Sequence, residues 1–127
     1  AMDAWLKSLQ PMTSPHLENG KLSASAERGQ ALFRSEEVGC ARCHKTELYT
    51  DLEHHDVGTR GAYDKGGEAF DTPTLVELWR TAPYLHDGSA ATVRDVLSTK
   101  NANDRHGKTS HLTKEQIDDL VAYLLSL

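Results

Sequence analysis

The sequence is poor in the residues that normally fill a hydrophobic core. Of its 127 residues, 38% are hydrophobic and only 6% are aromatic, so we expect one modest domain whose interior is completed by something besides side chains. No apolar run approaches the roughly 20 residues that a membrane-spanning helix needs. Asp and Glu outnumber Lys and Arg, and the resulting net charge of −5 disfavours nucleic acid as a partner. The composition therefore argues against a membrane span and against a phosphate-binding surface.

Strand patterns are also missing, because apolar and polar residues do not alternate over any long stretch. We therefore predict an all-α chain of about four to five short helices and long loops. The first helix of the domain is expected to begin at Ser25, as its N-cap, and to end near Arg34. Its apolar face would consist of Ala31, Leu32 and Phe33.

Two further short helices are indicated by capping residues. Thr72-Pro73 is typical of an N-cap followed by the first helical position, so a helix is expected from there through Trp79. Thr92, with Asp95 three residues later, forms a capping-box pattern and predicts another short helix.

The last helix has the clearest signal in the chain. Thr113 as N-cap, with Gln116 at the third helical position, predicts a helix over residues 114–126. Its apolar residues follow the i, i+3, i+4, i+7 spacing of one helix face: Ile117, Leu120, Val121 and Leu124. Residues 45–71 and 100–112 have no regular period and are expected to be loops, and the longer loop, 45–71, is expected to wrap around a bound group.

The N-terminal residues resemble the end of the same chain. Residues 3–9 read DAWLKSL, and residues 121–127 read VAYLLSL. We predict that residues 1–21 are a linker with the end of an upstream domain, and that residues 22–127 form the domain proper. The alternative is that two helix ends merely look alike.

The only two cysteines lie in one short motif, Cys40-Ala41-Arg42-Cys43-His44. C-x-x-C-H is the pattern of covalent c-type haem attachment, in which two thioethers hold the porphyrin and the histidine binds the iron. A redox disulfide would be expected in a βαβ setting, and a zinc site would need a second pair of ligands at matching spacing. One covalent haem c, held by Cys40 and Cys43 with His44 as axial ligand, is the favoured interpretation.

Three segments add a family resemblance: residues 70–75 (FDTPTL), 81–89 (TAPYLHDGS) and the helix over 112–124. Together with the haem motif they resemble the C-terminal domain of bacterial di-haem cytochrome c peroxidases and their MauG-like relatives. The resemblance implies a class I cytochrome c fold around the haem. Four residues of these segments are also expected to contact the haem: Pro73, Leu75, Trp79 and Tyr84.

The chain departs from that family in two respects. It carries one C-x-x-C-H motif where those peroxidases carry two, and it has no methionine after Met12 to serve as a distal ligand. In a class I cytochrome the distal ligand comes from the loop before the last helix, which favours His106 as the sixth iron ligand. The alternatives are His55, His111 and His86.

These features predict a periplasmic or otherwise exported domain that transfers single electrons through one bis-histidine haem. The expected partner is a redox protein or another haem domain of the same polypeptide, with no catalysis by this chain alone. One alternative is the electron-entry domain of a larger di-haem peroxidase-like enzyme. A ligand-binding haem domain and a haem-stapled docking module are the others.

Overall fold

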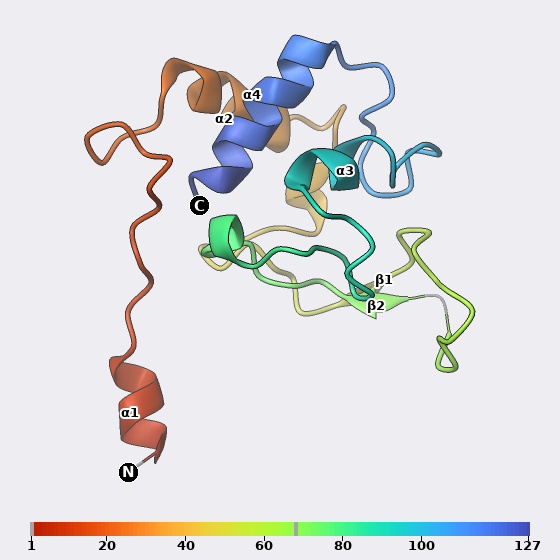
Figure 1. The fold of residues 1–127 in the computed structure, drawn as a ribbon, viewed down its shortest axis with the longest axis horizontal. Helices are drawn as coiled ribbons and strands as arrows, with labels where there is room; N and C mark the ends of the chain where they lie inside the picture. The colour runs from red at the N-terminus through yellow and green to blue at the C-terminus, as the bar shows by residue number, and fades with distance from the viewer. Residues whose placement is uncertain (1, 68) are drawn as a thin grey trace.

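The computed structural model describes residues 2–67 and 69–127 (Figure 1). Within them there are four α-helices: α1 (Met2–Ser8), α2 (Ala24–Arg34), α3 (Val93–Leu97) and α4 (Lys114–Leu125). The long connections contain two 3-10 turns, η1 (Cys40–Arg42) and η2 (Leu78–Arg80), and two strands, β1 (His54–His55) and β2 (Phe70–Asp71). Figure 1 shows α2, α3 and α4 grouped together, with the strands and the long loops beneath them.

Helices α2 and α4 cross in close contact at the centre of the fold. Gly29 of α2 is buried there, and a Cβ atom added to it would lie 1.9 Å from the backbone oxygen of Asp119. The missing side chain therefore allows the two backbones to approach. Tyr123 packs edge-on against Phe33, with ring centroids 5.3 Å apart. The other buried apolar residues of the core are Ala26, Val38, Leu75, Val93, Leu97, Ile117, Leu120 and Leu124.

A polar cluster joins the same two helices. Arg28 donates to both carboxylate oxygens of Asp119, at 2.8 and 2.7 Å, and the Ser25 hydroxyl donates to one of them at 2.6 Å. The hydrogen bond from Arg28 lowers the pKa of Asp119, against the opposing effect of burial. Asp119 is therefore an ionised hydrogen-bond acceptor at neutral pH and ties α2 to α4.

The predicted start of α2 is wrong by two residues. Ser23, not Ser25, is the N-cap, and its hydroxyl accepts a hydrogen bond from the Ala26 N–H at 3.1 Å. Both serines could cap a helix locally, but Ser25 is taken by Asp119 of α4. Ala31, expected on the apolar face, is exposed.

The capping boxes of α3 and α4 are confirmed. The Thr92 hydroxyl accepts from the Asp95 N–H, and the Asp95 carboxylate accepts from the Thr92 N–H. Thr113 and Gln116 exchange the same two bonds at the start of α4. These helix starts depend on neighbours in sequence only, which explains why the sequence predicts them well.

The helix predicted from Thr72 through Trp79 is wrong, because only the short turn η2 forms in that segment. Thr72 is buried, and its N–H donates to the Glu53 carbonyl at 2.9 Å. The Thr72 carbonyl accepts from the Thr50 hydroxyl at 2.6 Å. These bonds to a distant loop hold Thr72 in place of a helical cap.

The expectation of an all-α chain also needs a correction. Strands β1 and β2 pair antiparallel, with His54 opposite Asp71 and His55 opposite Phe70. Two residues are too short to produce a visible alternation of apolar and polar residues, so the sequence contains no signal for them. The rest of residues 45–71 is irregular, apart from turns, in the part that the structure describes.

Helix α1 projects away from the other helices (Figure 1) and buries none of its residues. The segment that joins it to α2 is attached to the domain at two points. Ser14 is buried and donates to the Leu125 carbonyl at 2.6 Å, and the Met12 N–H donates to the Glu77 carboxylate. None of the helices in the described residues is long and apolar enough to cross a bilayer. The domain boundary near residue 21 stays a prediction.

Candidate functional site

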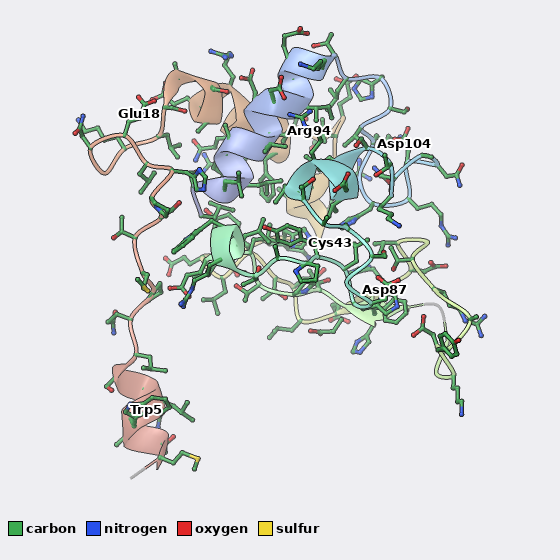
Figure 2. All side chains as sticks on the ribbon, in the orientation of Figure 1. Trp5, Glu18, Cys43, Asp87, Arg94 and Asp104 are labelled. Atoms are coloured by element: carbon green, nitrogen blue, oxygen red, sulfur yellow. The ribbon has the colours of Figure 1, made fainter. Side chains whose placement is uncertain are left out.

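The C-x-x-C-H motif folds into one tight turn. The Cys40 carbonyl, at the start of η1, accepts hydrogen bonds from the N–H groups of both Cys43 and His44. Because two successive N–H groups share this carbonyl, both cysteines and His44 are held on the same turn. Figure 2 shows Cys43 between helix α3 and the loops beneath it.

Both cysteines are free thiols and half-buried. Burial raises the pKa of Cys40 to about 11 and also raises the pKa of Cys43. Reactive cysteines of redox disulfide sites have lowered pKa values, so these thiols do not have the electrostatics of such a site. One potential ligand atom each from Cys43, Asp51 and His55 lies within 4.8 Å of the others, which is one ligand fewer than the four of a structural zinc site.

His44 is oriented by a backbone carbonyl. Its Nδ1 lies 2.9 Å from the Tyr49 carbonyl oxygen, which can only accept, so Nδ1 carries the proton and Nε2 has the free lone pair. Burial lowers the pKa of His44, and the bond to Tyr49 opposes that effect only in part. The histidine is therefore neutral at neutral pH, as a metal ligand must be.

His106 lies across from His44. The two ring centroids are 6.1 Å apart, and the ring planes are inclined by 35°. Burial, together with a smaller contribution from the nearby His44, lowers the pKa of His106 to about 4. The structure thus brings together the two histidines that sequence reasoning proposed as an axial pair, both neutral and both half-buried.

The other candidate histidines have different surroundings. His55 Nε2 pairs with Asp51 at 2.9 Å, and His111 Nε2 pairs with Glu37 at 3.3 Å near the surface. His86 stacks on Phe70, with ring centroids 3.7 Å apart. Its two ring nitrogens contact the Thr59 hydroxyl at 3.3 Å and the Asp64 carboxylate at 3.0 Å. Each of these rings therefore has a structural partner for at least one nitrogen.

Two of the four residues expected beside the haem belong to the core cluster or pack against it: Leu75 and Tyr84. Leu75 is buried, and the half-buried Tyr84 donates from its hydroxyl to the Leu78 carbonyl at 3.1 Å. Pro73 is exposed, and its backbone raises the pKa of His44 less than the Tyr49 carbonyl does. These placements leave the role of the four residues as haem contacts a prediction.

Trp79 provides a test of whether this site suits a haem. Among the described residues, its Nε1 is the buried side-chain polar atom that has no hydrogen-bond partner. A buried donor without a partner is costly, and a haem carboxylate is an acceptor that would satisfy it. Two thiols and a neutral histidine on one turn are the groups that hold a haem c, and the unpartnered Trp79 donor suits one of its carboxylates.

Two groups near the histidines were not found by sequence reasoning. The Tyr49 carbonyl orients His44, and the Asn101 side chain holds the backbone of His106. A backbone carbonyl has no residue-type signal, so Tyr49 could not be identified. Asn101 lies in the polar loop before α4 and resembles an ordinary turn asparagine until its burial is known.

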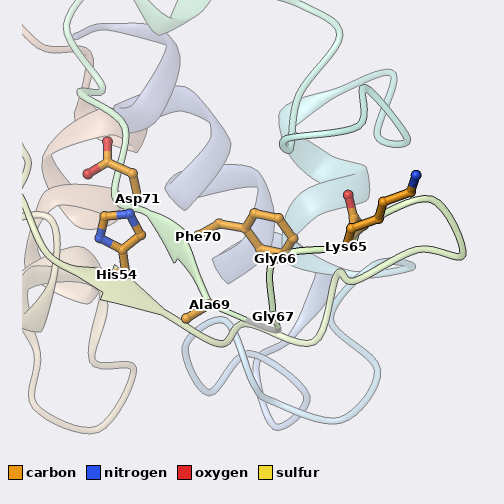
Figure 3. A pocket seen from close by; sticks show the side chains of 8 residues that line it. His54, Lys65, Gly66, Gly67, Ala69, Phe70 and Asp71 are labelled. Carbon is orange, nitrogen blue, oxygen red and sulfur yellow. The ribbon is translucent and has the colours of Figure 1, made fainter.

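A separate open pocket of about 340 Å³ lies beside the two strands (Figure 3). Its lining comprises His54, Asp64, Lys65, Gly66, Gly67, Ala69, Phe70 and Asp71. Within the described part of the chain, this lining contains none of the residues expected to hold the haem. We therefore assign the pocket no part in the site.

Comparisons with known proteins agree with this geometry. The family model described as Cytochrome c matches residues 26–127. The chain is 31% identical over 169 residues to hydrazine synthase subunit gamma of Kuenenia stuttgartiensis, covering 100% of this chain and 48% of the relative. It is 33% identical over 129 residues to the methylamine utilization protein MauG of Methylorubrum extorquens, covering 87% of this chain and 36% of that protein.

Two solved structures have a similar fold. A hydrazine synthase chain of Kuenenia stuttgartiensis, from crystals pressurised with xenon, has a TM-score of 0.84 at 30% identity and covers 97% of this chain and 52% of its own. A MauG-like protein associated with microbial copper homeostasis has a TM-score of 0.67 at 25% identity, covering 86% and 48%. This chain spans about a third to a half of the length of these relatives. The matched family model, the haem motif and the helices around it show that the chain belongs to the cytochrome c family.

Proposed function

We propose that this chain transfers single electrons through one covalently held haem c, with His44 and His106 as its two axial ligands. The separation of the two rings carries the proposal. Two imidazoles bonded to one metal ion from opposite sides would have ring centroids about 6.3 Å apart, since each metal–nitrogen bond is about 2.0–2.1 Å long. The observed separation is 6.1 Å.

Each residue of the haem motif and its surroundings would have one role. Cys40 and Cys43 would bind the porphyrin, and the Tyr49 carbonyl would keep the Nε2 lone pair of His44 directed at the iron. When bound, the haem iron supplies the one-electron couple, taking an electron from a reduced partner protein and passing it to an oxidised one. With His106 in place of a methionine, we expect a lower potential than that of a His/Met haem.

The axial pair is tested by substituting His106 in the holoprotein. The wild-type protein should have the optical spectrum of a six-coordinate low-spin haem. His106→Ala should produce a five-coordinate haem that binds cyanide and carbon monoxide. His111→Ala is the matched control, because His111 is more exposed and pairs with Glu37 at the surface. An unchanged spectrum and potential in His106→Ala would show that another residue binds the iron.

The same experiment separates electron transfer from ligand binding. A haem with two imidazole ligands has no free coordination position for peroxide or a gas. If the wild-type protein has a five-coordinate spectrum, the ligand-binding alternative replaces the present proposal. Covalent attachment takes place outside the cytoplasm, so we also propose a periplasmic or otherwise exported location.

A second candidate function rests on α1. The Ser8 hydroxyl donates to the Trp5 carbonyl at 2.7 Å, and the Ser126 hydroxyl donates to the Tyr123 carbonyl at 2.6 Å. The end of α1 therefore repeats the end of α4 in hydrogen bonding as well as in sequence. This repetition favours a chain in which α1 ends a second, upstream cytochrome c unit.

The burial of the two helix ends differs sharply. Tyr123 and Leu124 of α4 are 1% and 6% exposed, whereas Trp5 and Leu6 at the matching positions of α1 are 61% and 53% exposed. The first helix of an upstream unit would cover α1, as α2 covers α4 here. This chain would then be the electron-entry domain of a larger di-haem peroxidase-like protein.

The gene provides a direct test of this second candidate. A further C-x-x-C-H motif should be encoded upstream, with its histidine about as far before Leu9 as His44 lies before Leu127. Its absence would contradict the electron-entry role and leave the single-haem function. Peroxidase activity would then be measured in the longer protein, with this domain alone as the control.

A further inference from the structure

The loop that carries His106 is held by one buried side chain. Asn101 is 4% exposed, and its Oδ1 accepts a hydrogen bond from the His106 N–H at 2.8 Å. Its Nδ2 faces three acceptors: the His106 carbonyl at 3.1 Å, the Gly107 carbonyl at 2.8 Å and the Thr109 hydroxyl at 2.8 Å. Asn101 therefore binds both backbone groups of His106, and the loop closes around its carboxamide.

The same loop is joined to the backbone that leads into the haem motif. The Lys108 N–H donates to the carbonyl of the buried Val38 at 2.8 Å, two residues before Cys40. Gly107, between His106 and Lys108 in the chain, has a φ of 76°. A Cβ atom at this position would lie 3.2 Å from the Val38 oxygen and 3.8 Å from Cys40 Sγ. Glycine is therefore needed both for this backbone conformation and for this close approach.

The far end of the loop is fixed as well. Thr109 is buried, and its hydroxyl donates to the Leu97 carbonyl at the end of α3 at 2.7 Å. The Asp104 carboxylate accepts from the N–H groups of Thr109 and Ser110, both at 2.9 Å. The loop is thus closed on itself by Asn101. Lys108 connects it to the backbone just before the cysteine motif, and Thr109 connects it to the end of α3. All of these bonds exist within the polypeptide and need no bound group.

We infer that Asn101 is a positioning residue. It keeps the His106 imidazole at the distance from His44 at which both rings can bind the same haem iron. This inference rests on the proposed axial role of His106. A histidine on a flexible loop dissociates readily and leaves a free coordination position on the iron. A histidine whose backbone N–H and carbonyl are both hydrogen-bonded returns to the same position. Asn101 would therefore keep the haem six-coordinate in both oxidation states and closed to small molecules.

The rate of carbon monoxide binding to the reduced holoprotein tests this inference. Carbon monoxide can bind only after His106 leaves, so the rate at saturating gas reports the dissociation of His106. Asn101→Ala should raise this rate about tenfold or more, the ratio that corresponds to about 1.4 kcal/mol, close to one lost buried hydrogen bond. Thr109→Val removes one hydrogen-bond acceptor of Asn101 and keeps the shape of the side chain, so it should raise the carbon monoxide binding rate by a smaller factor. This variant replaces Asn101→Ala in the test if Asn101→Ala does not fold.

A matched control separates positioning from general loss of stability. Ser14→Ala also removes two hydrogen bonds of a buried side chain, but it acts at the segment before α2 and not at the loop. It should lower the unfolding midpoint and leave the carbon monoxide rate unchanged. An equal increase in Ser14→Ala, or no increase in either loop variant, would overturn the inference.

His106→Ala distinguishes the inference from the function on which it rests. If His106→Ala binds carbon monoxide rapidly while the Asn101 and Thr109 variants behave like wild type, His106 is a ligand and Asn101 does not position it. If His106→Ala binds no faster than wild type, the axial assignment itself is refuted.

Discussion

Substitution of Gly29 by alanine tests the crossing of α2 and α4, on which the position of the haem motif depends. The added Cβ atom would lie 1.9 Å from the backbone oxygen of Asp119, 2.5 Å from its carbonyl carbon and 2.9 Å from Cβ of Tyr123. Backbone atoms cannot rotate away as the end of a flexible side chain can. Helix α4 would have to move by about 1 Å, in a core that is packed as densely as an organic crystal.

The effect of Gly29→Ala on stability is the difference between two opposing free energies, a gain in helix propensity and a cost of overpacking. Replacement of glycine by alanine within a helix is favourable by about 0.5–1 kcal/mol, because alanine restricts the unfolded chain and suits the helix. Overpacking of a core costs about 1–3 kcal/mol, and this overlap involves the backbones of both helices. We therefore expect Gly29→Ala to lower the free energy of unfolding by about 2 kcal/mol, with the Arg28–Asp119 pair disturbed as well.

Denaturant unfolding of the holoprotein, followed by circular dichroism and by haem absorbance, measures this change. Ala31→Gly is the control on the same helix: Ala31 is exposed, so only helix propensity should act, with a loss of about 0.5–1 kcal/mol. An unchanged or higher unfolding midpoint for Gly29→Ala would refute the argument, because it would mean that the two backbones are not in contact at this position.

Three further predictions concern the haem and the polar cluster. Intact mass after denaturation should include one haem per chain, and the Cys40→Ala, Cys43→Ala double variant should lose it; a mass equal to the bare polypeptide in matured wild-type protein would refute covalent attachment. Trp79→Phe should move the pH-dependent part of the haem midpoint potential to higher pH, because loss of an N–H donor raises the pKa of a carboxylate; an unmoved profile would exclude that bond. Since the pKa of Asp119 is lowered in the folded chain, its stabilising effect is present above the ordinary Asp pKa of about 3.9 and is lost as the pH falls through the folded value. Arg28→Met should therefore reduce stability at pH 7 more than at pH 2, as acid and thermal unfolding would show; an equal loss at both pH values would contradict the pairing.

Much of the local structure could be predicted from the sequence alone. The starts of α3 and α4 depend on hydrogen bonds between residues three positions apart, and those pairs are visible as Thr92 with Asp95 and Thr113 with Gln116. The haem motif is equally local, because two cysteines and a histidine on one turn define it. The loop before the last helix likewise pointed to His106, through its place in the chain and the absence of a later methionine.

Hydrogen bonds between segments that are distant in the sequence decided the helix starts that were predicted wrongly and the geometry of the site. Ser25 and Thr72 carry local capping signals, yet each is bonded to a residue far away in the chain, Asp119 and Glu53 respectively, and neither caps a helix. The approach of His106 to His44, and the hold of Asn101 on the His106 loop, likewise depend on how separate segments meet. The sequence by itself determined which groups are available to bind a haem, because residue type and short spacing set their chemistry. Tertiary structure determined which of them face one another, because hydrogen bonds between distant segments compete with local ones and here outweigh them.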